Sequence, residues 1–201
     1  MPLTYSPDTT AAAWLVQSDT PVTSLLNFGP TIFEAYGRLR FIPDPVAPGQ
    51  NESDADVPAG HPSDIAQARR ALRLLARFTS TPQDCYFCVW EGYSDIPLPP
   101  DVRHGPLVEI PHRRYALVRG ALHDIDAWEA DLGDGMPVAP PAFVWPADRR
   151  WCFASDVDPH WAGIGAEKAA VDALIGDTRL DVVTADPTAD QPLYRPGGFE
   201  N

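Results

Sequence analysis

The stretch 145–165, which reads WPADRRWCFASDVDPHWAGIG, constrains the fold of this 201-residue chain more than any other part of it. It holds three of the six tryptophans, and the Asp-Pro-His step at 158–160 is a turn signal. We expect a strand over 151–157 that pairs with a second strand over 161–164 as a hairpin. The neighbouring segments are expected to pack on this hairpin.

The rest of the chain predicts helices first and then strands with short helices between them. Helices are expected over 22–27, 31–38, 63–78, 123–132 and 166–175. Strands are expected over 85–93, 107–110, 114–119 and 180–184. This order predicts an α+β fold, a single domain over residues 1–185 with a mainly antiparallel sheet and helices packed on one face.

Two segments are too poor in large apolar residues to pack well. Residues 43–62 (PDPVAPGQNESDADVPAGHP) are rich in proline, glycine and acids, so their burial would not offset the entropy cost of ordering them. We predict that 43–62 is a mobile acidic loop whose removal costs little stability. Residues 186–201 are predicted to form a flexible C-terminal tail.

The net charge limits the classes of binding partner that the chain can have. The chain has 28 acids against 15 bases and a net charge of −13, which disfavours nucleic acid and anionic lipid. Such a charge fits plain solubility or a cationic protein partner. No apolar run approaches the roughly 20 residues of a membrane span, and the N-terminus lacks signal-peptide features, so we expect a cytoplasmic protein. The sequence leaves the oligomeric state open.

The cysteine pair Cys85 and Cys88 forms a CxxC pattern inside a predicted strand. Residues three apart in a strand point to opposite faces, and a zinc site needs two further ligands, for which only Cys152 and scattered histidines are available. We therefore predict reduced, unmetallated cysteines, and we expect no metal or cofactor. The odd number of cysteines agrees with a reducing compartment.

Asp156, Asp158 and His160 are the candidate catalytic residues. Their i, i+2, i+4 spacing would place them on one face of a strand, where they could hold a divalent metal or a water molecule for general-base chemistry. They also flank a proline turn, where polar residues collect for structural reasons. We interpret them as a structural turn and keep a metal-assisted or general-base hydrolase as the alternative.

The candidate binding residues are aromatic and arginine side chains, namely Trp90, Tyr93, Trp145, Arg149 and Trp161. Tryptophan faces beside guanidinium groups make flat contact surfaces. Within 145–151, however, Arg–Trp stacking and pairing of Asp148 with an arginine would also fix a turn, and we favour that structural role. A second alternative is a small-ligand binding module with an aromatic pocket and Arg149 or Arg150 as the anion anchor.

Common catalytic signatures are absent from the sequence. It contains no GxSxG elbow, Walker loop, GxGxxG or HExxH motif, which argues against the usual hydrolases, NTPases and dehydrogenases. The helix over 63–78 carries four arginines opposite its apolar stripe, and we interpret these as a solvated face paired with local carboxylates.

Three stretches resemble a family of uncharacterised actinobacterial proteins. They are FGPTIFEAYGRLRF (28–41), TPQDCYFCVWEGY (81–93) and WPADRRWCFASDVD (145–158), in the same order over most of the chain. The resemblance implies a GC-rich actinobacterium or its phage as the source. It carries over no catalytic residue.

The charge of −13, the aromatic residues and the missing catalytic motifs together favour binding over catalysis. We predict a non-catalytic acidic module that acts through protein binding. One concrete form is an immunity- or antitoxin-like protein that covers a basic toxin.

Overall fold

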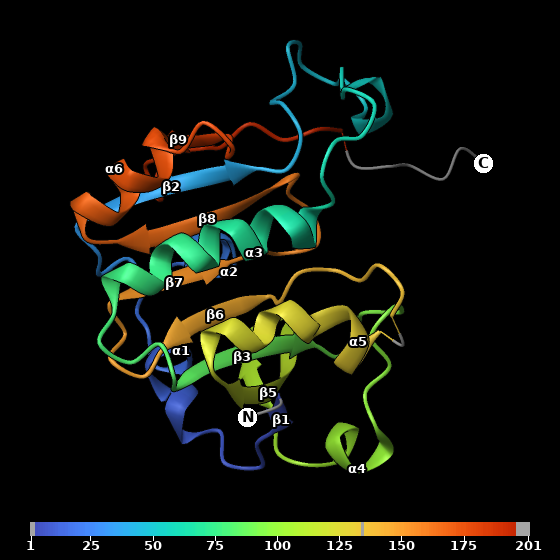
Figure 1. The fold of residues 1–201 in the computed structure, drawn as a ribbon, viewed down its shortest axis with the longest axis vertical. Coiled ribbons are helices and arrows are strands. Elements are labelled where there is room, and N and C mark those ends of the chain that lie inside the picture. The colour runs from blue at the N-terminus through green and yellow to red at the C-terminus, as the bar shows by residue number, and fades with distance from the viewer. Residues whose placement is uncertain (1–2, 134, 196–201) are drawn as a thin grey trace.

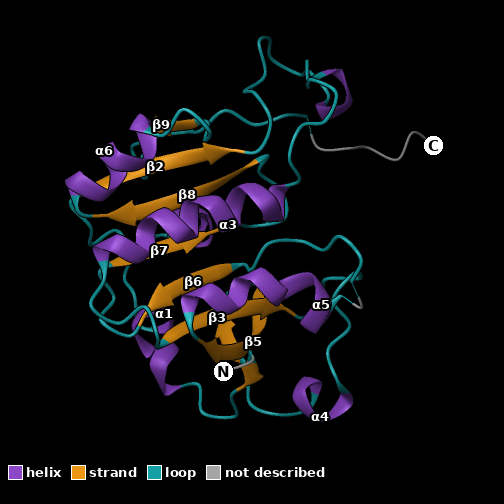
Figure 2. Ribbon diagram, in the orientation of Figure 1, coloured by secondary structure: helices purple, strands orange, loops and turns teal. Residues whose placement is uncertain are grey.

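The structure, a computed structural model, describes residues 3–133 and 135–195, in which nine strands form one antiparallel sheet (Figures 1 and 2). The strand order is β1-β5-β3-β6-β7-β8-β2-β9, and β4 pairs with β5. The strands are β1 (Thr4–Tyr5), β2 (Ala35–Arg40), β3 (Cys85–Trp90), β4 (Val108–Ile110), β5 (Arg113–Gly120), β6 (Phe143–Pro146), β7 (Trp151–Ala154), β8 (Trp161–Ala166) and β9 (Val182–Thr184). The predicted α+β class and antiparallel sheet are confirmed.

Helices cover both faces of the sheet. The α-helices are α1 (Ala13–Val16), α2 (Val22–Phe28), α3 (Asp64–Leu75), α4 (Pro100–Arg103), α5 (Trp128–Leu132) and α6 (Lys168–Gly176). The 3-10 segments are η1 (Thr10–Ala12), η2 (Glu52–Asp54), η3 (Ala76–Phe78) and η4 (Leu122–Ala127). In Figure 1, α3, α5 and α6 lie in front of the sheet and α2 is largely hidden behind it.

The alternation of side chains along β3 explains these two layers. Phe87 packs in one core with residues of α3, η4 and α6. Cys88 packs in a second core with Leu15 of α1 and Leu25 of α2. The prediction of helices on one face therefore holds for the larger helices and omits α1 and α2.

The predicted central hairpin is formed by β7 and β8, which are buried at every residue. β7 ends at Ala154, three residues before the predicted end at 157. Gly163 of β8 lies directly under α2, where an added Cβ would come within 2.0 Å of the Asn27 carbonyl oxygen. The glycine therefore lets α2 pack against the sheet.

The helix predicted over 31–38 is wrong, because residues 31–34 form turns and bends and residues 35–38 belong to strand β2. β2 is hydrogen-bonded to β8 on one side and to β9 on the other, and most of its residues are buried. The apolar residues of so short a segment fit either period, and pairing on both sides decides in favour of the strand. The helix predicted over 123–132 is present as η4 followed by α5.

The topology brings three strand ends to one edge of the sheet. β6 separates β3 from β7, and β8 separates β7 from β2, each in antiparallel pairing, so β2, β3 and β7 run in the same direction. The residues that follow these three strands, 41–44, 91–95 and 155–160, therefore meet. The turn 146–150 lies at the opposite edge.

The segment 43–62 and the tail contact this region. At the ends of the loop, Asp44 pairs with Arg38, and the ring of His61 lies 2.5 Å from the Phe41 carbonyl oxygen. The described part of the tail, 186–195, accepts a hydrogen bond from the Trp161 indole at the Pro192 carbonyl and donates one from the Tyr194 hydroxyl to the Pro43 carbonyl. The mobility of loop and tail stays a prediction, and 196–201 lies outside the described residues.

Candidate functional site

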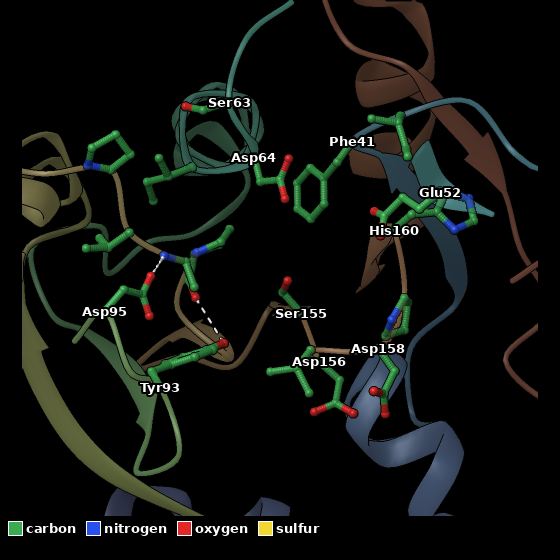
Figure 3. A pocket seen from close by; sticks show the side chains of 18 residues that line it. Phe41, Glu52, Ser63, Asp64, Tyr93, Asp95, Ser155, Asp156, Asp158 and His160 are labelled. Carbon is green, nitrogen blue, oxygen red and sulfur yellow. Dashed lines mark hydrogen bonds between the residues drawn. The ribbon is translucent and has the colours of Figure 1, made fainter. Parts of the chain in front are cut away.

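An acidic cleft of about 500 Å³ opens where β2, β3 and β7 end and α3 begins (Figure 3). Its lining contains the carboxylates of Glu52, Asp64, Asp95, Asp156 and Asp158. No lysine or arginine is among the described residues that line it. The volume falls within the range of roughly 300–1,000 Å³ usual for small-ligand pockets.

Glu52 and Asp64 are the unpaired acids of the cleft. Glu52 comes from η2 in the segment 43–62, and Asp64 is the first residue of α3. Within the described chain neither carboxylate has a hydrogen bond or an ion pair. Burial, and next the charge of Glu52, raise the pKa of Asp64, while His61 opposes this change. A cation at this position would therefore be favourable.

Asp156 forms a salt bridge with Arg113. The guanidinium donates from Nε to Oδ1 and from Nη2 to Oδ2, each at 3.0 Å, and it lies 5.0 Å from the ring centroid of Trp90. The Asp158 side chain is 81% exposed, with its Oδ2 3.7 Å from Arg113 Nη2. The two-point contact with Arg113 holds Asp156 in place and neutralises its charge.

His160 faces Asp44 through its Nε2, which lies 3.0 Å from Asp44 Oδ1. Burial alone would raise the pKa of Asp44, but hydrogen bonds from Arg38 and His160 lower it to about 2. Burial lowers the pKa of His160, and Asp44 raises it only in part. The neutral imidazole then donates from Nε2 to the carboxylate, which leaves its buried Nδ1 without a partner in the described structure.

Asp156, Asp158 and His160 line one cleft but do not converge on one point. Asp156 faces Arg113, Asp158 faces solvent and His160 faces Asp44. Because β7 ends at Ala154, the strand spacing that predicted a shared face does not apply to them. No group of three or more His, Cys, Asp or Glu side chains among the described residues is arranged to hold a metal ion.

Ser155 is the site residue that the sequence did not single out. It is only 4% exposed, it lines the cleft, and its hydroxyl points into the cleft between Asp64 and Asp156 in Figure 3. Within the described chain this hydroxyl has no hydrogen-bond partner. This hydroxyl is open to the cleft and can donate or accept a hydrogen bond, so a polar group of a ligand would be well placed here. The only sequence signal is the change from aromatic to polar residues after Phe153.

The predicted binding aromatics divide into two kinds. Tyr93 lines the cleft and donates from its hydroxyl to the Pro140 carbonyl at 3.3 Å, and Trp90 packs edge-on against it. Trp145 and Trp161 are 0% and 1% exposed, so neither presents a flat face at the surface, although Trp145 borders a second pocket together with Arg149. They belong to β6 and β8, inner strands that are covered on both faces.

Arg149 lies in the turn at the opposite edge, apart from the cleft. Its φ of 54° is in the left-handed region, and its guanidinium lies 5.6 Å from the ring centroid of Trp14. Arg149 therefore stacks on Trp14, a residue outside the turn, instead of on Trp145 or Trp151 as predicted. The predicted pairing of Asp148 with an arginine side chain is wrong, because its carboxylate accepts hydrogen bonds from Thr79, Ser80 and the Arg150 amide.

The cysteines point apart as predicted, since Cys85 packs in one core and Cys88 in the other. Both are free in the structure, as is Cys152. Burial raises the pKa of the Cys85 thiol to about 12, with smaller contributions from nearby carboxylates, so this thiol stays protonated near neutral pH. The predicted arginine pairing on α3 is also present, because Arg69 contacts Glu129 and Arg73 contacts Asp126.

No protein-family model, curated protein or solved structure matches this chain. The resemblance to an actinobacterial family therefore stays a prediction. None of the helices in the described part of the chain has the length and apolar character needed to cross a bilayer. The proposed function therefore rests on the geometry of the cleft.

Proposed function

We propose that this chain is an acidic binding protein whose cleft receives a cationic side chain, a lysine or an arginine, of a protein partner. The observation that carries the proposal is that the unpaired carboxylates of Glu52 and Asp64 line one cleft with the Ser155 hydroxyl, which points into it and makes no hydrogen bond within the described chain. An immunity- or antitoxin-like protein that covers a basic toxin is one concrete form. We propose a cytoplasmic location on the grounds given from the sequence.

The chemistry of the lining supports a ligand that donates hydrogen bonds. Carboxylates only accept, and an ammonium group brings three donors and a guanidinium five. The buried side chains of Phe41, Ile65 and Val138 also line the cleft, and they offer apolar surface to the alkyl stem of such a residue.

The net charge of −13 supports the same proposal at longer range. A strongly acidic protein attracts cationic partners and speeds their association, most of all at low salt. The hydrolase alternative lacks a comparable observation, because Asp156 is bound to Arg113 and His160 to Asp44.

The experiment is an NMR titration of the protein with N-acetyl-lysine amide and N-acetyl-arginine amide at low salt. Saturable shifts of the Ser155 and Asp64 backbone amides are expected, since these residues line the cleft. N-acetyl-norleucine amide, which has a similar stem without the charge, should cause no saturable shift.

The variant Glu52→Gln/Asp64→Asn should lose most of this response. The matched control is Glu109→Gln/Asp190→Asn, which removes two exposed acids outside the cleft and should respond as the wild type does. Equal shifts with the norleucine compound, or an undiminished response in Glu52→Gln/Asp64→Asn, would refute the proposal.

A further inference from the structure

The carboxylates of the cleft fall into two groups on either side of Ser155. The first group is Glu52 and Asp64, which are close enough for the charge of one to raise the pKa of the other. The second is Asp156 and Asp158, which share Arg113. In Figure 3 Asp64 lies on one side of the Ser155 hydroxyl and Asp156 with Asp158 on the other.

A single cationic group would leave much of this charge unmatched. Arg113 neutralises one acid of the second group through its two-point contact with Asp156, and Asp158 keeps its charge at the mouth of the cleft. The first group contains no cation among the described residues that line the cleft. Asp95 adds a further carboxylate, although its Oδ2 accepts a hydrogen bond from the Ala139 amide.

We infer that the ligand of the cleft carries two cationic groups on one chain, one for Glu52 and Asp64 with Ser155 and one for Asp158. This inference rests on the proposed function and specifies its ligand. A basic peptide segment with two nearby lysines or arginines has this chemistry, and so does a polyamine. Two linked charges gain because the second contact forms within the complex already made by the first.

The experiment is calorimetric titration at low salt with N-acetyl-lysine amide, the N-acetyl amides of Lys-Lys and Lys-Ala-Lys, and the diamine putrescine. At least one ligand with two cationic groups should bind roughly fivefold to tenfold more tightly than the single lysine, as a second, partly exposed ion pair would provide. The peptides and putrescine distinguish a protein segment from a free polyamine as the source of the two charges.

The variant Asp158→Asn isolates the second contact. Because this side chain is 81% exposed, the change should leave the fold intact. It should remove most of the advantage of the doubly charged ligands over the single lysine, and Asp190→Asn is the matched control. Asp156→Asn is not used, since it would leave Arg113 without its partner.

The two proposals fail in different ways. If the single lysine binds the wild type as tightly as every doubly charged ligand, or if Asp158→Asn leaves their advantage intact, the inference of a dicationic ligand is wrong and the proposed function stands. If neither class binds, or if Glu52→Gln/Asp64→Asn binds both as the wild type does, the proposed function itself is wrong.

Discussion

The turn 146–150 and the cleft lie at opposite ends of the central strands, and their charged residues have different partners. At the turn 146–150, the Asp148 carboxylate accepts hydrogen bonds from the Ser80 and Arg150 amides and from the hydroxyls of Thr79 and Ser80. At the cleft edge, Asp64 has no hydrogen bond or ion pair within the described chain. Both acids sit beside the ends of buried strands, so this contrast comes from their partners.

The effects on pKa follow the same contrast. Burial opposes ionisation of Asp148, but hydrogen bonds led by those from Ser80 and Thr79 outweigh it and lower the pKa. At Asp64, burial and the charge of Glu52 prevail and raise the pKa. Charged Asp148 therefore stabilises the fold, whereas charged Asp64 is tolerated. A group that costs stability is typical of a functional site.

The largest expected effect is on the turn. Asp148→Ala should lower the free energy of unfolding by about 3 kcal/mol at neutral pH, because it leaves two amides and two hydroxyls without their charged acceptor. The contribution of Asp148 is complete above its unfolded-state pKa of about 4, and it is lost as the pH falls through the lowered folded-state pKa. Urea unfolding at pH 7 and pH 3 measures both.

The exposed acid Asp190 serves as the control, and Asp190→Ala should change stability by less than about 0.5 kcal/mol. Asp148→Ala should still bind N-acetyl-lysine amide once folded, because the turn lies at the other edge from the cleft. A stability loss no larger than that of the control would mean that the turn is fixed by other contacts.

An intermediate effect is expected from removing residues 49–60 and joining the ends with a short Gly-Ser link. This segment contributes no side chain to the buried core, so the free energy of unfolding should change by less than about 1 kcal/mol. The deletion removes Glu52, and cation binding should weaken severalfold. Urea unfolding and calorimetry measure the two properties separately.

The single variant Glu52→Gln should reproduce the loss of binding with the loop intact. A loss of several kcal/mol in the deletion variant would show that the segment is packed. Normal binding by both variants would restrict the first contact to Asp64 and Ser155.

The sequence was sufficient for the elements whose pattern is strongly periodic or marked by turns. The helix over 63–78 has a clear apolar stripe, and the hairpin of β7 and β8 has tryptophans on both sides of a proline turn. The segment 31–38 failed because eight residues with apolar positions on both faces fit either period. Its strand state is decided by β8 and β9, which lie far away in the sequence.

The site was less predictable than the fold for a similar reason. Asp156, Asp158 and His160 line the cleft, but their partners Arg113 and Asp44 come from other strand ends and were not predicted. The role of Ser155 depends on the absence of a hydrogen-bond partner for its hydroxyl within the described fold, and no local sequence pattern predicts such an absence. Trp145 and Trp161 were expected at a surface because the number of layers over the sheet was not apparent from the sequence.

The decisive test of cation binding in the cleft is the pKa of the Asp64 carboxyl, measured by NMR with and without saturating N-acetyl-lysine amide. We predict a pKa above the usual 3.8 in the free protein and a lower pKa in the complex, because the ammonium stabilises the charged form. Asp64→Asn should leave stability at pH 7 unchanged or slightly higher. A pKa that is not raised in the free protein, or that the ligand does not lower, would contradict the account.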